Sequence, residues 1–175
     1  MGAKLVGHND TLQEAGAILW SGGTGAWFLK NSQLRRGRAN EGNHRLNYVR
    51  ETDYVSAACA LVPRALFLRH GMFDLHFSPG YYEDTDLAFT MRALGLRVLY
   101  QPFAHVFHES HTTYAGSMDA LIERNRQHFI SKWSAQLRHH MPPCEVAAAC
   151  RPEHRLRLLR LVRLASRLLD YLVVD

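Results

Sequence analysis

Apolar and polar residues recur with two different periods along the first 140 positions of the chain. Short runs rich in aliphatic and aromatic residues, bounded by turn-forming residues such as His8-Asn9-Asp10, are typical of β-strands. Apolar residues three or four positions apart indicate helices that bury one face. The predicted strands are residues 3–7, 12–20, 53–62, 96–102 and 104–110.

Three segments of this region have the helical period, and proline or glycine marks several of their ends. A short helix is predicted over residues 63–71, because proline suits the first turn of a helix and glycine its end. A second helix is predicted from Glu83 to Gly95 and a third over residues 117–137. Residues 21–46 mix glycine, asparagine and arginine without a period, which predicts a long loop.

The composition changes after residue 141, where Pro142-Pro143 marks a boundary. We therefore predict two parts, a domain over residues 1–141 and a linker with a basic amphipathic helix over residues 142–175. The sequence leaves three interpretations of this helix: it packs on the body or on a following domain, it lies on an anionic lipid surface, or its last residues begin a strand of another domain.

Charge and cysteine content exclude several classes of protein. The net charge is +5, and the six arginines and three acids of residues 151–175 contribute +3 of it. The first 150 residues are thus nearly neutral, which predicts no nucleic-acid partner. Three cysteines without a Cys-x-x-Cys pair predict neither a disulfide framework nor a closed zinc site. With no recognisable secretory signal, the expected location is the cytoplasm, at the inner face of the plasma membrane if the tail binds lipid.

The segment "SPGYYEDTDLAFTMRALG", residues 78–95, places Glu83, Asp84 and Asp86 directly after Tyr81 and Tyr82. Carboxylates are favoured at the start of a helix by its free amide groups and its dipole, so capping explains part of the pattern. One cap needs only one acid, however, and it needs no tyrosines. The crowding of like charges also raises carboxylate pKa values toward a range that is useful for catalysis.

A histidine cluster follows the predicted strand at residues 96–102. His105, His108 and His111 surround Glu109 at a predicted strand end, where ligands gather in α/β sheets. Imidazoles near carboxylates indicate metal binding, general base catalysis, or both.

The stretch "YVSAACALVPRALFLRHGMFDLHFSPGYYEDTDLAFTMRALGLRVLYQPFAHVFHE" resembles the second half of the catalytic domain of family 2 glycosyltransferases, especially bacterial rhamnosyltransferase-like members. Including "KLVGHNDTLQEAGAILW" and "NRQHFISKW", the resemblance covers residues 3–140. It implies an α/β fold with a partial GT-A-like (Rossmann-like) mixed sheet flanked by helices, to which the C-terminal amphipathic helix is added. It also implies inverting transfer from a nucleotide-diphosphate sugar to a saccharide or lipid-linked acceptor.

The same resemblance implies roles for individual residues. Asp84 matches the catalytic base, and His108 matches the family's ligand for a divalent metal, Mg or Mn. The expected acceptor-binding residues are Glu83, Asp86, Tyr81 and Tyr82.

The sequence departs from the family pattern in three respects. Ala57 and Met72 stand where the family often has glycine. The family's nucleotide-binding strands and Asp-x-Asp motif lie upstream of the matched region. We therefore expect a fragment that lacks the nucleotide-binding half and that pairs with this missing half or with an oligomer partner.

Two other functions remain open from the residues themselves. The chain is a non-catalytic remnant or saccharide-binding module of the same fold, or it is a small metal-dependent hydrolase that uses His105, His108 and Asp84. Binding of a nucleotide sugar with manganese separates the first alternative from a transferase, and tight metal binding without any nucleotide identifies the second.

Overall fold

The computed structural model describes residues 1–7, 10–27, 46–109 and 118–142. All of them belong to the first of two compact units into which the chain divides, Met1–Pro143 and Cys144–Asp175. The predicted tail helix, its membrane contact and His111 lie outside the described residues. The strands are β1 (Gly2–Val6), β2 (Leu12–Glu14), β3 (Ala17–Leu19), β4 (Gly25–Trp27), β5 (Arg50–Glu51) and β6 (Leu99–Phe107). The helices are α1 (Arg64–Arg69), α2 (Glu83–Ala93), α3 (Asp119–Leu137) and the 3-10 helices η2 (Ala57–Cys59) and η3 (Leu75–Phe77).

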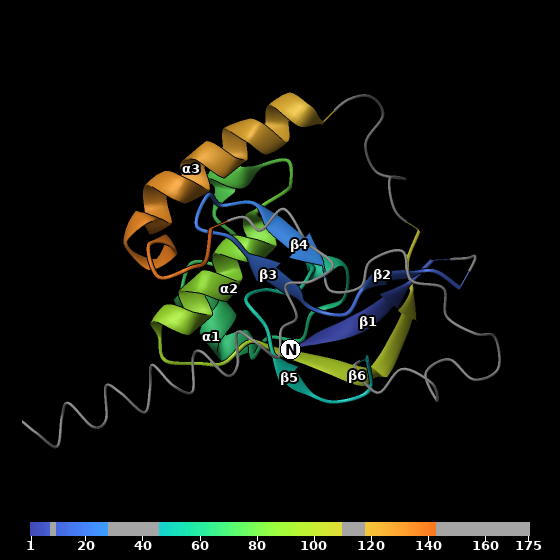
Figure 1. The fold of residues 1–175 in the computed structure, drawn as a ribbon. Coiled ribbons are helices and arrows are strands. Elements are labelled where there is room, and N and C mark those ends of the chain that lie inside the picture. The colour runs from blue at the N-terminus through green and yellow to red at the C-terminus, as the bar shows by residue number, and fades with distance from the viewer. Residues whose placement is uncertain (8–9, 28–45, 110–117, 143–175) are drawn as a thin grey trace, which may run out of the picture. The chain divides into compact units, whose positions relative to one another are not determined.

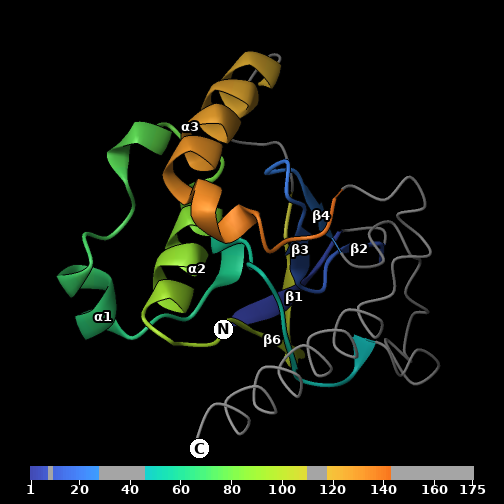
Figure 2. The same ribbon diagram turned by 60° about the vertical axis from the view of Figure 1, so that its left-hand side comes forward.

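The protein has a mixed α/β architecture, as the sequence predicted. Four strands form one sheet in the order β2-β1-β6-β5, in which β1 and β6 are parallel and the other pairs are antiparallel. Helices α1, α2 and α3 gather on one side of the strands (Figure 1), and the view turned by 60° shows the same separation (Figure 2). Every residue of β1 is buried, as expected for a strand with neighbours on both edges.

Strand β6 continues through Pro102, although this proline led us to predict two separate strands. Ala3 pairs with Gln101, but the next residue, Lys4, pairs with His105, so residues 102–104 have no partner in the β1 register. Proline has no N–H to donate to a neighbouring strand, and an irregularity is where a sheet tolerates it. The prediction of a break was therefore wrong. The strand continues, and the shift in its register with β1 accommodates the proline.

The predicted strand at residues 12–20 is two short strands with different partners. Gly16 lies between them with φ +78°, a conformation that favours glycine, and its position leaves little room for a side chain beside Thr52. Strand β2 pairs with β1, whereas β3 pairs with β4 in a separate two-stranded sheet. Strand β4 falls within residues 21–46, which we predicted to be a loop throughout.

The predicted buried strand at residues 53–62 was wrong. Only isolated bridges form there, at Tyr54 and Ala60, and the 3-10 helix η2 occupies the middle. Ser56 caps η2 by accepting a hydrogen bond from the Ala58 amide, which turns the chain out of an extended path. Burial of the whole segment is also excluded, since Leu61 is 74% exposed.

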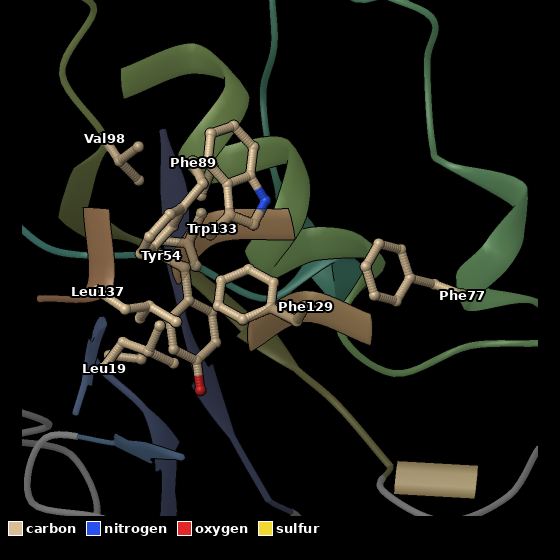
Figure 3. Packing of buried hydrophobic residues seen from close by; sticks show 11 residues of the cluster. Leu19, Tyr54, Phe77, Phe89, Val98, Phe129, Trp133 and Leu137 are labelled. Atoms are coloured by element: carbon tan, nitrogen blue, oxygen red, sulfur yellow. The ribbon is translucent and has the colours of Figure 1, made fainter. Parts of the chain in front are cut away.

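The three predicted helices are confirmed, and α2 and α3 supply five of the eleven residues of a shared core. Gly71 and Gly95 follow α1 and α2 with positive φ, as helix-ending glycines do. Phe89 of α2 and Phe129 of α3 meet edge to face with ring centroids 5.0 Å apart (Figure 3). The core cluster consists of Ala17, Leu19, Tyr54, Val55, Phe77, Ala88, Phe89, Val98, Phe129, Trp133 and Leu137. Within the described ranges, no helix combines the length and the apolar content that crossing a bilayer requires.

Candidate functional site

Helix α2 begins with an unusual pair of backbone conformations. Tyr81 and Tyr82 both have positive φ, of 70° and 73°, and the first helical bond runs from the Asp86 amide to the Tyr82 carbonyl at 2.8 Å. No side chain caps the helix at Tyr82. The three acids of the first turn therefore act on the helix through its dipole and through contacts farther away, not as an N-cap.

Asn125 of α3 holds the loop that leads into α2, a role that the sequence did not indicate. The side chain is fully buried, and its Nδ2 donates to the carbonyls of Phe77 (3.0 Å), Gly80 (2.9 Å) and Tyr81 (2.9 Å). Arg124 adds a bond of 2.7 Å from Nη2 to the Ser78 carbonyl. The position of the acids thus depends on a helix some 40 residues farther along the chain.

Asp84 is half-buried, and its carboxylate joins the start of α2 to η2. Its Oδ2 accepts from the Ala57 amide at 3.3 Å, and its Oδ1 accepts from the Thr85 amide at 2.7 Å. Burial raises the pKa of the Asp84 carboxyl, because removal from water disfavours the charged form, while these amides act in the opposite direction. The group is therefore a stronger base than an aspartate in water.

A cavity of about 470 Å³ opens beside Asp84. Its volume lies within the usual range for small-molecule sites. Among the described residues that line it, Asp84 is the one acid, Arg64 and Arg97 are the cations, and the walls are mainly apolar. The lining residues are Met1, Val55, Ala57, Ala60, Leu61, Val62, Pro63, Arg64, Leu66, Phe67, Phe73, Asp84, Leu87, Ala88, Met91, Leu96, Arg97 and Val98.

Glu83 stands next to Asp84, and its carboxyl is poorly solvated. Burial raises the pKa of Glu83, and the neighbouring charge of Asp84 raises it further. Its Oε2 is buried and has no hydrogen-bond partner among the described residues. The pKa values of the two adjacent carboxyls are thus both raised, mainly by burial, and the crowding of like charges contributes at Glu83.

Asp86 and Tyr82 face the protein interior. Asp86 is 3% exposed, and its oxygens accept hydrogen bonds from Trp133 Nε1 (2.6 Å) and Lys132 Nζ (2.9 Å) of α3. The hydroxyl of Tyr82 donates to the Gly23 carbonyl at 2.8 Å, and its ring packs on the core beside Phe129. A saccharide would have to displace these contacts in order to bind either side chain. Tyr81 is half-buried in the same turn.

His108 lies directly after β6, and the residues that line the Asp84 cavity do not include it. Its Nδ1 is 2.9 Å from Gln13 Oε1, and Gln13 Nε2 donates to the His108 carbonyl at 2.7 Å. Its amide donates to the Val6 carbonyl at 2.9 Å, which extends the β1–β6 ladder by one residue. Burial lowers the pKa of His105 on the same strand, and the charge of Lys4 contributes to this shift.

Among the described residues, one group of three side chains has a geometry that could hold a metal ion, and it is not at His108. The group is Asp74, His76 and His128, whose potential ligand atoms all lie within 4.8 Å of one another. Asp74 and His76 flank the start of η3, whereas His128 belongs to α3. No local sequence pattern connects positions 76 and 128, so only the packing of η3 against α3 brings them together.

Comparisons with known proteins do not assign the chain to a family. No family model matches it, and no curated protein and no solved structure gives a match. The described residues establish a mixed α/β protein with an acidic helix start beside a cavity.

Proposed function

We propose that this chain provides the acceptor-binding and base-bearing part of an inverting glycosyltransferase with a GT-A-like fold. The donor is a nucleotide-diphosphate sugar, and the acceptor is a saccharide or lipid-linked saccharide of cell-surface polysaccharide synthesis. The observation that carries the proposal is the position of Asp84, a carboxyl of raised pKa on the wall of a cavity of about 470 Å³.

The chemistry requires one well-placed base. A sugar hydroxyl is a weak nucleophile, so a carboxylate must take its proton while the oxygen attacks the anomeric carbon and the bond to the diphosphate breaks. Attack from the face opposite the leaving group inverts the configuration of that carbon. A raised pKa makes Asp84 a better proton acceptor, and its hydrogen bonds to the amides of Ala57 and Thr85 fix its orientation.

The surroundings of Asp84 also suit a polar substrate that carries negative charge. Arg64 and Arg97 line the same cavity, where guanidinium groups offset the charge of a diphosphate. Glu83 is the neighbouring carboxyl with a raised pKa, but it does not line the cavity, so its proposed part is to influence Asp84 through its charge rather than to contact the acceptor.

The described residues around His108 do not support binding of the divalent metal that the resemblance implies. A catalytic metal site usually needs about three protein ligands, and among these residues no group of three His, Cys, Asp or Glu side chains includes His108. The proposed mechanism therefore contains no step that depends on a metal at His108.

The test compares Asp84→Asn with Glu123→Gln in a transfer assay that uses the longest reading frame containing this chain. Glu123 is an exposed carboxylate on α3 and serves as the matched control. Loss of a general base lowers kcat by roughly 10²- to 10⁴-fold, whereas acceptor binding persists. Unchanged turnover in Asp84→Asn refutes the assignment. Because the Asn side chain would place an amide group against the Ala57 or Thr85 amide, urea unfolding of the variant at pH 7 is measured alongside, so that lost turnover is not mistaken for lost folding.

A saccharide-binding module without transfer is the second candidate function. The lack of a three-ligand group around His108 among the described residues favours it, because a transferase of the resembled family holds a metal there. Isothermal titration distinguishes the two candidates: a module binds the saccharide with no dependence on nucleotide sugar, and no product forms on prolonged incubation with both substrates.

A further inference from the structure

A small cluster of side chains lies where η3 packs against α3, and none of its members lines the Asp84 cavity. It contains Asp74, His76 and His128, with Lys132 beside Asp74. We propose that Asp74, His76 and His128 bind a transition-metal dication, Zn²⁺ being the ion that suits this donor set, and that the bound ion connects η3 to α3. The proposal does not depend on glycosyl transfer.

The distances between the donor atoms fit an ion placed among them. Asp74 Oδ1 is 2.8 Å from His76 Nδ1, and Asp74 Oδ2 is 3.9 Å from His128 Nε2. Zinc bonds of about 2.0–2.1 Å in a tetrahedral arrangement separate neighbouring donor atoms by about 3.4 Å. The two distances involve different oxygens of Asp74, and the rings of His76 and His128 are stacked at 20° to each other, so the His76 ring must turn before both nitrogens face one ion. The side chain of His76 is 75% exposed, which leaves it free to rotate.

The environment of His128 Nε2 is the most direct support for a bound ion. Its Nε2 is a buried atom with no hydrogen-bond partner among the described residues, and 3.9 Å to Asp74 is too long for a hydrogen bond. Buried polar atoms nearly always have a partner, and an atom without one is often the ligand of a bound ion or water. The His128 ring is held by an edge contact with the buried Phe77 at 5.0 Å between centroids, and the exposed His76 ring stacks on its other side at 4.9 Å.

The local charge also favours a cation. Lys132 Nζ is 2.8 Å from Asp74 Oδ2 and 2.9 Å from Asp86 Oδ2, so two carboxylates share one ammonium group. With neutral imidazoles, these groups leave one negative charge for an incoming ion. Lys132 also competes for Asp74 Oδ2, which leaves Oδ1, the oxygen beside His76, as the better ligand atom.

Two imidazole nitrogens and one carboxylate oxygen select the class of metal. Imidazole suits Zn²⁺ and neighbouring transition metals, whereas Mg²⁺ and Ca²⁺ prefer oxygen ligands throughout. Three protein ligands leave the fourth position of a tetrahedral site to water. The chain is thus expected to bind Zn²⁺ and to ignore Mg²⁺ at equal concentration.

A bound ion would strengthen the connection between α3 and the segment that leads into α2. His128 is three residues after Asn125 and therefore on the same face of α3. Asn125 already bonds to the loop that follows η3, and a metal at His128 would bind the residues just before that loop. The ion would stabilise the folded protein, because the unfolded chain does not bring residues 74 and 128 together.

The experiment titrates Zn²⁺, and separately Mg²⁺, into the full chain by calorimetry, and measures Tm with and without each ion. Wild type should bind one Zn²⁺ at this site with a rise in Tm and should not respond to Mg²⁺. His76→Gln and His128→Gln should each weaken Zn²⁺ binding by about tenfold or more, since even outer-shell changes cost that much in metal sites. His139→Gln changes an exposed histidine just after α3 and should bind as wild type does.

The variants distinguish Zn²⁺ binding at this site from binding to other histidines, since the chain has 11 histidines in total. Because His76 is exposed, His76→Gln should fold normally, so its loss of binding cannot be ascribed to unfolding. NMR spectra of the imidazole protons should show the His76 and His128 signals shifting together with one equivalent of Zn²⁺. Absence of Zn²⁺ binding in wild type, or binding that is equally tight in His76→Gln, overturns the proposal.

Discussion

Replacement of Asn125 by leucine removes the buried amide through which α3 holds the loop before α2. Leucine has a similar shape, but it cannot donate to the carbonyls of Phe77, Gly80 and Tyr81, which lie 2.9–3.0 Å from Asn125 Nδ2. The substitution therefore tests whether this loop, and with it the start of α2, is fixed by α3 or by its own turn geometry.

The expected loss of stability follows from the hydrogen-bond count. An amide nitrogen carries two hydrogens, so the three carbonyls share the equivalent of two full bonds. A buried acceptor that loses its donor costs about 1–3 kcal/mol, and burying leucine in place of a polar group recovers part of that. We expect Asn125→Leu to lower the free energy of unfolding by roughly 2–4 kcal/mol, a large fraction of the stability of a typical domain.

Urea unfolding followed by tryptophan fluorescence measures this change, because Trp133 is buried two turns farther along α3. With a urea m-value of about 2 kcal/mol/M, the midpoint should fall by roughly 1–2 M. Gln136→Leu, at an exposed position of the same helix, is the control and should stay within about 0.5 kcal/mol of wild type. A loss below about 1 kcal/mol in Asn125→Leu refutes the view that α3 positions the loop.

Three further substitutions test other parts of the structure, each by the same unfolding measurement. Burial, together with the charge of Arg50, lowers the pKa of Lys4 from 10.5 to about 8, so Lys4→Met should stabilise the protein at pH 7 by about 1–3 kcal/mol. The stability of wild type relative to Lys4→Met should rise between pH 8 and 10.5, where only the unfolded wild-type chain keeps the proton, and a flat difference in that window contradicts the burial of a charged lysine. Gly25→Ala places a methyl group 2.3 Å from the Tyr54 hydroxyl and should cost about 1–3 kcal/mol, whereas wild-type stability would mean that the ring moves freely. Asp86→Asn puts an amide hydrogen against Trp133 Nε1 or the Lys132 ammonium and should cost about 1–3 kcal/mol; no loss would show that the link between α2 and α3 is dispensable.

The sequence by itself determined the helices and the place where the acids gather. Apolar spacing, together with Pro63, Gly71 and Gly95, predicted α1 and α2 because these signals act within a few residues of one another. The pKa values of Glu83 and Asp84 are both raised, but burial is the main cause at each, and the like charge that the sequence indicated contributes only at Glu83.

The tertiary structure alone decided which partner each segment and side chain has. Gly16 and Pro102 are both residues that often interrupt a strand. A strand boundary does fall at Gly16, whereas β6 continues through Pro102 with a shift in its register with β1, because pairing with the neighbouring strand determines the outcome. His128 meets Asp74, and Asp86 meets Trp133, across about 50 residues of chain. Periodicity indicates which face of an element is apolar, but it contains no information about which distant face will cover it. For that reason the sequence predicted a cluster of acids and a set of histidines, and only the packing of α3 decided which of them lie together.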